Sequence, residues 1–236
     1  MKLVIANFKM NLLKDEIDDY INYFNNKDYP NVFFAPSSIY LTEFVENGLK
    51  TVSQDVGIDE KGAYTGDISA RQLKSIGVNY SIVGHSERRK YYQDDNYVNK
   101  KIKNLLEEEM IPILCIGENI NERKDGLYKE KLQKQIDEAF LNIDNSLLSN
   151  IIIAYEPIWS IGTGIVPTNM EINDTVNFIK NYLQEKYQVN LKILYGGSVN
   201  NSCIKTLSEV IIIDGYLVGG CSINKEEFKK LIEAVK

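Results

Sequence analysis

Eight short apolar runs recur along this 236-residue chain, and they restrict its possible folds more than any other feature. Each run is rich in isoleucine, valine and leucine, and its apolar residues are nearly continuous rather than alternating. Strands buried on both faces have this pattern, which is typical of a parallel sheet. The runs span residues 3–8, 31–36, 50–56, 80–85, 111–117, 151–157, 191–197 and 211–220.

Longer segments between these runs carry apolar residues at helical spacing. Such stripes predict helices over residues 94–109, 169–187 and 223–235, and a shorter helix over 69–77 with Ser69 as its N-cap. Strands that alternate with helices in this way predict a single (β/α)8 barrel domain, residues 1–236, in the α/β class. The alternative is an open, doubly wound sheet, but that fold usually has fewer strands, and no GxGxxG motif follows the first run.

Charge and cysteine usage narrow the class of partner. A net charge of −6 argues against nucleic acid or an anionic membrane, but a small anionic substrate stays open because a local site can be positive. Cys115, Cys203 and Cys221 are too few and scattered for a disulfide framework, and with one histidine they lack zinc-site spacing. We therefore expect no metal.

The same features predict a cytoplasmic protein with no membrane partner. Scattered free cysteines fit a reducing cytosol. The N-terminal segment turns polar again at Asn7, so it has no signal-peptide core. No apolar run approaches the ~18 residues that a membrane helix requires.

Polar residues follow several of the predicted strands. Asn7 and Lys9 come after the first run, His85 and Glu87 after the fourth, and Glu156 at the end of the sixth. Each has a plain structural explanation when it is taken alone, as a surface charge, a structural imidazole or a strand end before proline. Barrels place their active sites at the carboxyl ends of their strands, so the shared position favours catalysis.

Glycine-rich turns in the second half of the chain indicate the class of substrate. The stretches "SIGTG", "YGGS" and "VGGCS" expose backbone N–H groups, and the last precedes a helix whose N-terminal dipole favours an anion. Barrel enzymes commonly bind phosphate at the loops after strands seven and eight. With Lys9 at the same mouth, the sequence predicts a small phosphorylated metabolite as ligand and shows no P-loop or nucleotide fingerprint.

A carboxylate, an imidazole and an ammonium group together suit proton abstraction next to a carbonyl. Glu156 would take a carbon-bound proton, while His85 and Lys9 would stabilise the charge that grows on oxygen.

At these residues the chain resembles the triosephosphate isomerase family, and the resemblance runs from residue 3 to the end. It rests on the ordered stretches "NFKMN" (7–11), "VGHSERR" (83–89), "CIGE" (115–118), "AYEPIWSIGTG" (154–164), "YGGSV" (195–199) and "GYLVGGCS" (215–222). The resemblance implies reversible conversion of dihydroxyacetone phosphate and D-glyceraldehyde 3-phosphate, without cofactor or metal.

The resemblance also implies roles for single residues. Glu156 would be the base, His85 the electrophile, and Lys9 and Asn7 substrate contacts. In that family a helix N-terminus keeps the imidazole uncharged, and here that helix opens at "SERR". The phosphate would be held by the backbone N–H groups of Gly162, Ser198, Gly219 and Gly220. Glu87 and Ser86 would support the site.

Two loops and two departures from the family pattern complete the expectations. Residues 158–166 would be a lid that excludes water, and residues 62–69 would insert into the partner of a homodimer, with Thr65 at the neighbour's site. The alternative for residues 62–69 is simply a long glycine-containing loop. Pro167 at the far hinge of the lid would narrow its motion. Cys221, where alanine is usual, is expected to be inert packing, although a thiol at a helix N-terminus can have a lowered pKa.

Two other functions stay open at this point. Another phosphate-binding barrel isomerase or epimerase would share the glycine turns but would not need His85 and Glu156 in these contexts. A non-enzymatic role on the same fold predicts loss of the glutamate, histidine and lysine set, and all three are present.

Overall fold

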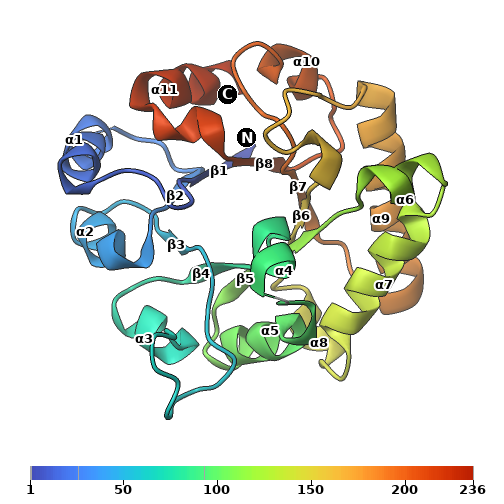
Figure 1. Ribbon diagram of the computed structural model, residues 1–236, viewed down its shortest axis with the longest axis horizontal. Coiled ribbons are helices and arrows are strands. Elements are labelled where there is room, and N and C mark those ends of the chain that lie inside the picture. Colours follow the sequence, from blue (N-terminus) through green and yellow to red (C-terminus); the bar gives the residue numbers. More distant parts are fainter. Residues whose placement is uncertain (1, 26, 93, 236) are drawn as a thin grey trace.

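Eight parallel strands form one curled sheet in the computed structural model, which describes residues 2–25, 27–92 and 94–235 (Figure 1). Their order is β2-β1-β8-β7-β6-β5-β4-β3, and an isolated parallel bridge between Phe34 and Thr51 joins the two end strands. The strands are β1 (Leu3–Asn7), β2 (Val32–Ala35), β3 (Val52–Ser53), β4 (Tyr80–Val83), β5 (Ile111–Ile116), β6 (Ile152–Tyr155), β7 (Lys192–Tyr195) and β8 (Gly215–Val218). The sheet is a nearly closed barrel, which confirms the predicted fold class over the doubly wound alternative.

Helices surround this barrel on its outer side (Figure 1). The α-helices are α1 (Lys14–Phe24), α2 (Leu41–Glu46), α3 (Ala70–Ser75), α4 (Ser86–Tyr92), α5 (Val98–Glu107), α6 (Ile120–Lys124), α7 (Tyr128–Phe140), α8 (Asn145–Leu148), α9 (Asn169–Tyr187), α10 (Ile204–Ser208) and α11 (Lys225–Ala234). Short 3-10 turns cover Ser38–Tyr40, Asp94–Asn96, Ile158–Ser160 and Gly220–Ile223. None of the helices in the described ranges combines the length and apolarity needed to cross a bilayer.

The strands are apolar on both faces because each face belongs to a different core. Successive side chains point to opposite sides of a strand. Ile5, Leu194 and Leu217 belong to a cluster inside the barrel, whereas their neighbours Val4 and Ile193 belong to the larger cluster shared with the helices. This arrangement explains why the runs are continuous rather than alternating.

Local signals set the start of two predicted helices. α3 begins after Ser69, whose side chain accepts from the backbone N–H of Gln72. α9 covers residues 169–187 as predicted, because Thr168 and Glu171 form a reciprocal capping box at its start.

Several predicted segments are wrong in extent; the run over 50–56, for example, is a strand only at Val52–Ser53. The helix predicted over 94–109 is divided, and α5 begins only at Val98, where the buried stripe starts. The helix predicted over 223–235 begins at Lys225, because Asn224 caps it. The strand predicted over 211–220 is limited to Gly215–Val218, since pairing with β1 begins at Gly215, and Ile211 is 87% exposed on the preceding connection.

Candidate active site

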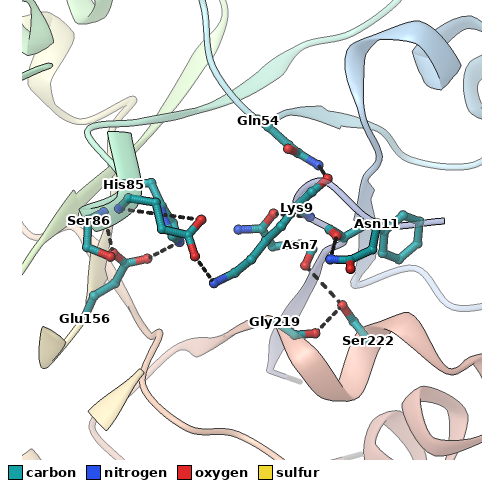
Figure 2. Close-up of polar contacts among 11 residues, drawn as sticks. Asn7, Lys9, Asn11, Gln54, His85, Ser86, Glu156, Gly219 and Ser222 are labelled. Atoms are coloured by element: carbon teal, nitrogen blue, oxygen red, sulfur yellow. Dashed lines mark hydrogen bonds and ion pairs between the residues drawn. The ribbon is translucent and has the colours of Figure 1, made fainter. Parts of the chain in front are cut away.

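The polar residues predicted to act together converge at the carboxyl ends of the strands (Figure 2). They come from the ends of four strands, β1, β4, β6 and β8, and from the turn after β7. A cavity of about 250 Å³ is lined by all eight of the predicted catalytic and phosphate-contacting residues: Asn7, Lys9, His85, Glu156, Gly162, Ser198, Gly219 and Gly220. A cavity of this size suits a small metabolite.

Glu156 is almost fully buried directly after β6, and its two carboxylate oxygens have different environments. Oε2 accepts the backbone N–H of Ser86 at 3.2 Å. Oε1 faces Nε2 of His85 at 3.3 Å, yet it has no partner with hydrogen-bond geometry among the described residues. One oxygen is therefore held, and the other is available to take a proton.

The backbone around Glu156 is packed so closely that the facing strand end needs a glycine. A Cβ on Gly117 would lie 1.7 Å from the carbonyl oxygen of Glu156. The Glu156 N–H donates to the carbonyl of Ile116 at 2.7 Å, which extends the β5–β6 ladder to Glu156 itself. Burial, with Glu156 close by, raises the pKa of the Cys115 thiol, so this side chain is a neutral group.

His85 follows β4 and lies at the start of α4, where its ring is fixed by the helix backbone. The N–H of Glu87 donates to Nδ1 at 3.2 Å. A ring nitrogen that accepts a hydrogen bond carries no proton, so the proton of the neutral imidazole is on Nε2. Nε2 is the nitrogen that faces the cavity side and Glu156.

Lys9 lies in a left-handed backbone conformation, with φ of 53°, which is unusual for a non-glycine residue. Its N–H donates to Oδ1 of Asn7 at 3.1 Å, and its carbonyl accepts from the Gln54 amide at 2.8 Å. These bonds stabilise the turn and direct the side chain across the mouth, where Nζ contacts Oε1 of Glu87 at 2.6 Å (Figure 2). This unfavourable backbone conformation places the Lys9 ammonium group at the mouth of the cavity.

The predicted phosphate end of the cavity is formed by the turns after β7 and β8. Gly220 opens a 3-10 turn in which the Ser222 N–H donates to the Gly219 carbonyl at 2.8 Å, and the Ser222 hydroxyl donates to the same carbonyl at 2.7 Å (Figure 2). Burial raises the pKa of the Cys221 thiol, which disfavours the reactive alternative for this cysteine and supports inert packing.

Sequence reasoning missed three residues that bind residues 158–166 or lie beside Glu156. Oε1 of Glu118 accepts from the Trp159 indole at 3.0 Å and from the Tyr155 hydroxyl at 3.1 Å, and burial raises the pKa of the Glu118 carboxyl. The other two are Ser160, whose hydroxyl donates to the carbonyl of Ile165, and Cys115, which lies beside Glu156. Glu118 follows a strand directly, so the rule that selected His85 and Glu156 could have selected it as well.

Pro167 is buried at the end of the predicted lid, next to the N-cap of α9. Because proline fixes φ, we expect Pro167→Ala to free the hinge and to change kcat and the lid relaxation rate by about two- to fivefold, the scale of proline effects on backbone entropy. The measurement is temperature-jump fluorescence of Trp159, the only tryptophan of the chain, beside steady-state turnover. Unchanged turnover and unchanged relaxation would contradict a hinge role for Pro167.

Thr65 does not reach this cavity within one chain. It is exposed on the loop between β3 and α3 and does not line the cavity that contains Glu156. Nor do the described ranges bring together three histidine, cysteine or acidic side chains in a way that could hold a metal ion.

The chain is a (β/α)8-barrel enzyme with its active site at the carboxyl ends of the strands. This class is defined by eight parallel strands inside a ring of helices, and by a buried carboxylate and imidazole with a partly buried ammonium beside glycine-rich turns. Comparison with known families specifies it further. The model of the triosephosphate isomerase family matches residues 2–235, so the chain belongs to that family.

Curated relatives resemble the chain over almost its whole length. A triosephosphate isomerase from Alkaliphilus oremlandii is 38% identical over 242 residues, which cover 98% of each chain. One from Mycoplasmopsis pulmonis is 41% identical over 245 residues, with 98% of this chain and 96% of the relative covered. One from Clostridium botulinum is 36% identical over 242 residues and 98% of each chain.

Proposed function

We propose that this chain interconverts dihydroxyacetone phosphate and D-glyceraldehyde 3-phosphate, as an intramolecular aldose–ketose isomerase of glycolysis and gluconeogenesis. The observation that carries this function is a family match over residues 2–235 together with an intact base, electrophile and ammonium in one cavity. Another phosphate-binding barrel isomerase or epimerase is not favoured, because the family match names one reaction.

In the proposed mechanism Oε1 of Glu156 removes a proton from the carbon next to the carbonyl, and the electron pair forms an enediolate. Nε2–H of His85 donates to the oxygen that gains charge, and the Lys9 ammonium stabilises the same charge. Glu156 then returns the proton to the adjacent carbon, while Nε2 of His85 gives its proton to the oxygen that gained charge and takes one from the neighbouring hydroxyl, so that the carbonyl forms at the second oxygen. The free Oε1 and the Nε2–H tautomer support these roles. Ser86 would orient the base through its N–H, and Glu87 would orient Lys9.

The phosphate would lie in the turns after β7 and β8 and under the lid. We assign its recognition to the backbone N–H groups of Gly162, Ser198, Gly219 and Gly220, with Lys9 as the nearby positive charge and Asn7 as a second contact with the substrate. Support comes from the cavity lining, in which glycines and Ser198 face the catalytic groups. The proposed chemistry uses side chains of this protein alone and needs no cofactor.

The proposed reaction is tested by isomerisation of D-glyceraldehyde 3-phosphate in a coupled assay. We expect fast turnover by the wild type and a kcat about 10²–10³-fold lower in His85→Gln, the usual effect of removing one aligned oxyanion donor. A folded wild type without turnover would contradict the proposed reaction, and an unaffected His85→Gln would contradict the proposed electrophile.

A homodimer is the assembly we propose, with residues 62–69 of each chain inserted beside the other chain's active site. A cavity of about 730 Å³ adjoins the catalytic residues and is lined by Lys9, Glu87 and exposed apolar side chains, including Met10 and Tyr91. Met10 is 95% exposed in the single chain, and Tyr64 on the inserting loop is half-exposed. A partner loop in this cavity would bury these side chains.

The dimer is tested by light scattering coupled to gel filtration. We expect twice the 27.0 kDa mass of one chain for the wild type and a shift toward the monomer for Thr65→Arg, because a long charged side chain would enter the partner's cavity. Thr206→Arg is the matched control, since Thr206 is an exposed threonine on α10 that does not line this cavity. A monomeric wild type would contradict the proposal.

We also place the protein in the cytoplasm, as is typical for the family, and take residues 1–236 as one domain.

A further inference from the structure

The hydroxyl of Ser160 connects the lid to the phosphate end of the cavity. Ser160 has no exposed surface, and its Oγ donates to the carbonyl of Ile165 at 2.6 Å, at the other end of the lid. The same Oγ accepts the backbone N–H of Ser198 at 3.1 Å and lies 3.5 Å from the Tyr195 hydroxyl. We call this set of contacts the Ser160 latch.

The hydrogen atoms of the Ser160 latch can be assigned from its geometry. A hydroxyl has one hydrogen, and that of Ser160 is directed to Ile165. Tyr195 therefore donates to Oγ of Ser160, as does the N–H of Ser198. Ser198 uses its hydroxyl as well, because its Oγ donates to the carbonyl of Ser160 at 2.5 Å. Both polar hydrogens of Ser198 are thus bound to one lid residue.

The Ser160 latch requires a glycine at position 197. A Cβ on Gly197 would lie 2.2 Å from the Tyr195 hydroxyl and 2.9 Å from Oγ of Ser160, so only glycine fits between Tyr195 and Ser198.

We propose that the Ser160 hydroxyl is a positioning group that occupies the phosphate's place at the Ser198 N–H and is displaced when phosphate arrives. This inference rests on the proposed function, in which that N–H binds phosphate. An incoming phosphate oxygen is a stronger acceptor than a neutral hydroxyl, so it takes the Ser198 N–H. Loss of that bond loosens the contact between Ser160 and Ile165. Phosphate binding and lid movement are thereby coupled through one side chain.

The Ser160 latch predicts that removing the hydroxyl tightens phosphate binding. In the wild type, phosphate must displace an existing hydrogen bond, whereas in Ser160→Ala the Ser198 N–H has no protein partner to lose. One net hydrogen bond corresponds to a Kd for inorganic phosphate that is roughly two- to tenfold lower. A purely structural role for Ser160 predicts the opposite sign, because a looser lid binds phosphate less well.

The experiment is isothermal titration of wild type, Ser160→Ala and Thr163→Ala with inorganic phosphate, which needs no turnover. Thr163→Ala is the matched control, since the Thr163 hydroxyl contacts only lid backbone, at the carbonyls of Trp159 and Ser160 and the N–H of Ile165. We expect a lower Kd in Ser160→Ala and no such decrease in Thr163→Ala. Ser160→Cys keeps the buried volume with a weakly bonding thiol, and it serves if the alanine variant does not fold.

The outcomes separate the Ser160 latch from the function on which it rests. An unchanged or higher Kd in both Ser160 variants, with phosphate binding and isomerase turnover intact in the wild type, overturns the latch alone. A wild type that isomerises its substrate but binds no inorganic phosphate overturns the assigned role of Ser198 and the latch with it. A wild type that neither binds phosphate nor turns over overturns the proposed function first.

Discussion

Replacing Glu156 with glutamine is expected to lower kcat by about 10³–10⁴-fold while the protein stays folded and binds phosphate. Glutamine has nearly the same shape as glutamate, and its carbonyl oxygen can still accept the Ser86 N–H that now binds Oε2. What it lacks is the basicity at the position of Oε1, which faces His85 without a hydrogen bond. General acid–base catalysis contributes factors of this size.

The measurement is kcat for D-glyceraldehyde 3-phosphate beside titration with inorganic phosphate. Glu156→Asp is the informative companion, because aspartate keeps the charge but withdraws it by one methylene. A displacement of about 1 Å costs roughly 10²-fold, so the aspartate variant should lie between the wild type and the glutamine variant. Retention of more than a tenth of wild-type kcat by Glu156→Gln would mean that another group is the base.

Replacing Lys9 with methionine is expected to lower kcat/KM by about 10²–10³-fold, the usual effect of removing one preorganised charge from the transition state. Methionine retains most of the stem of the side chain but no ammonium. The fold should survive, since Glu87, the partner of Lys9 at 2.6 Å, is about half exposed and remains solvated. The backbone bonds that stabilise the left-handed turn at residue 9 come from Asn7 and Gln54 and are unchanged.

Glu87→Gln separates the charge of Lys9 from its orientation. This variant keeps the ammonium and weakens only its ion pair with Glu87, so we expect a smaller loss than in Lys9→Met. Steady-state kinetics of both variants, with phosphate titration, make the comparison. Equal losses in the two variants would show that orientation by Glu87, rather than the charge itself, is what matters at Lys9.

Much of the site could be predicted from position along the chain. His85 and Glu156 each lie at the end of an apolar run. In a parallel barrel all strand ends meet at one rim, so their convergence could be predicted from the sequence. The apolar stripe at helical spacing likewise predicted the extent of α9, residues 169–187, from local spacing alone. The run at 211–214 gave a wrong strand boundary, because β-branched composition does not say which residues find a pairing partner.

The sequence by itself determined the order of strands and helices, the polar side chains at the strand ends and the glycine-rich turns, because these depend on periodicity and on residues near one another in the chain. Only the tertiary structure decided which oxygen of Glu156 is free, which nitrogen of His85 carries the proton, and that Ser160 binds the N–H of Ser198. The last contact joins residues 38 positions apart. Whether such a hydrogen bond forms depends on differences of a few tenths of an ångström in the distance between two strand ends. Those distances are set by the packing of the whole barrel.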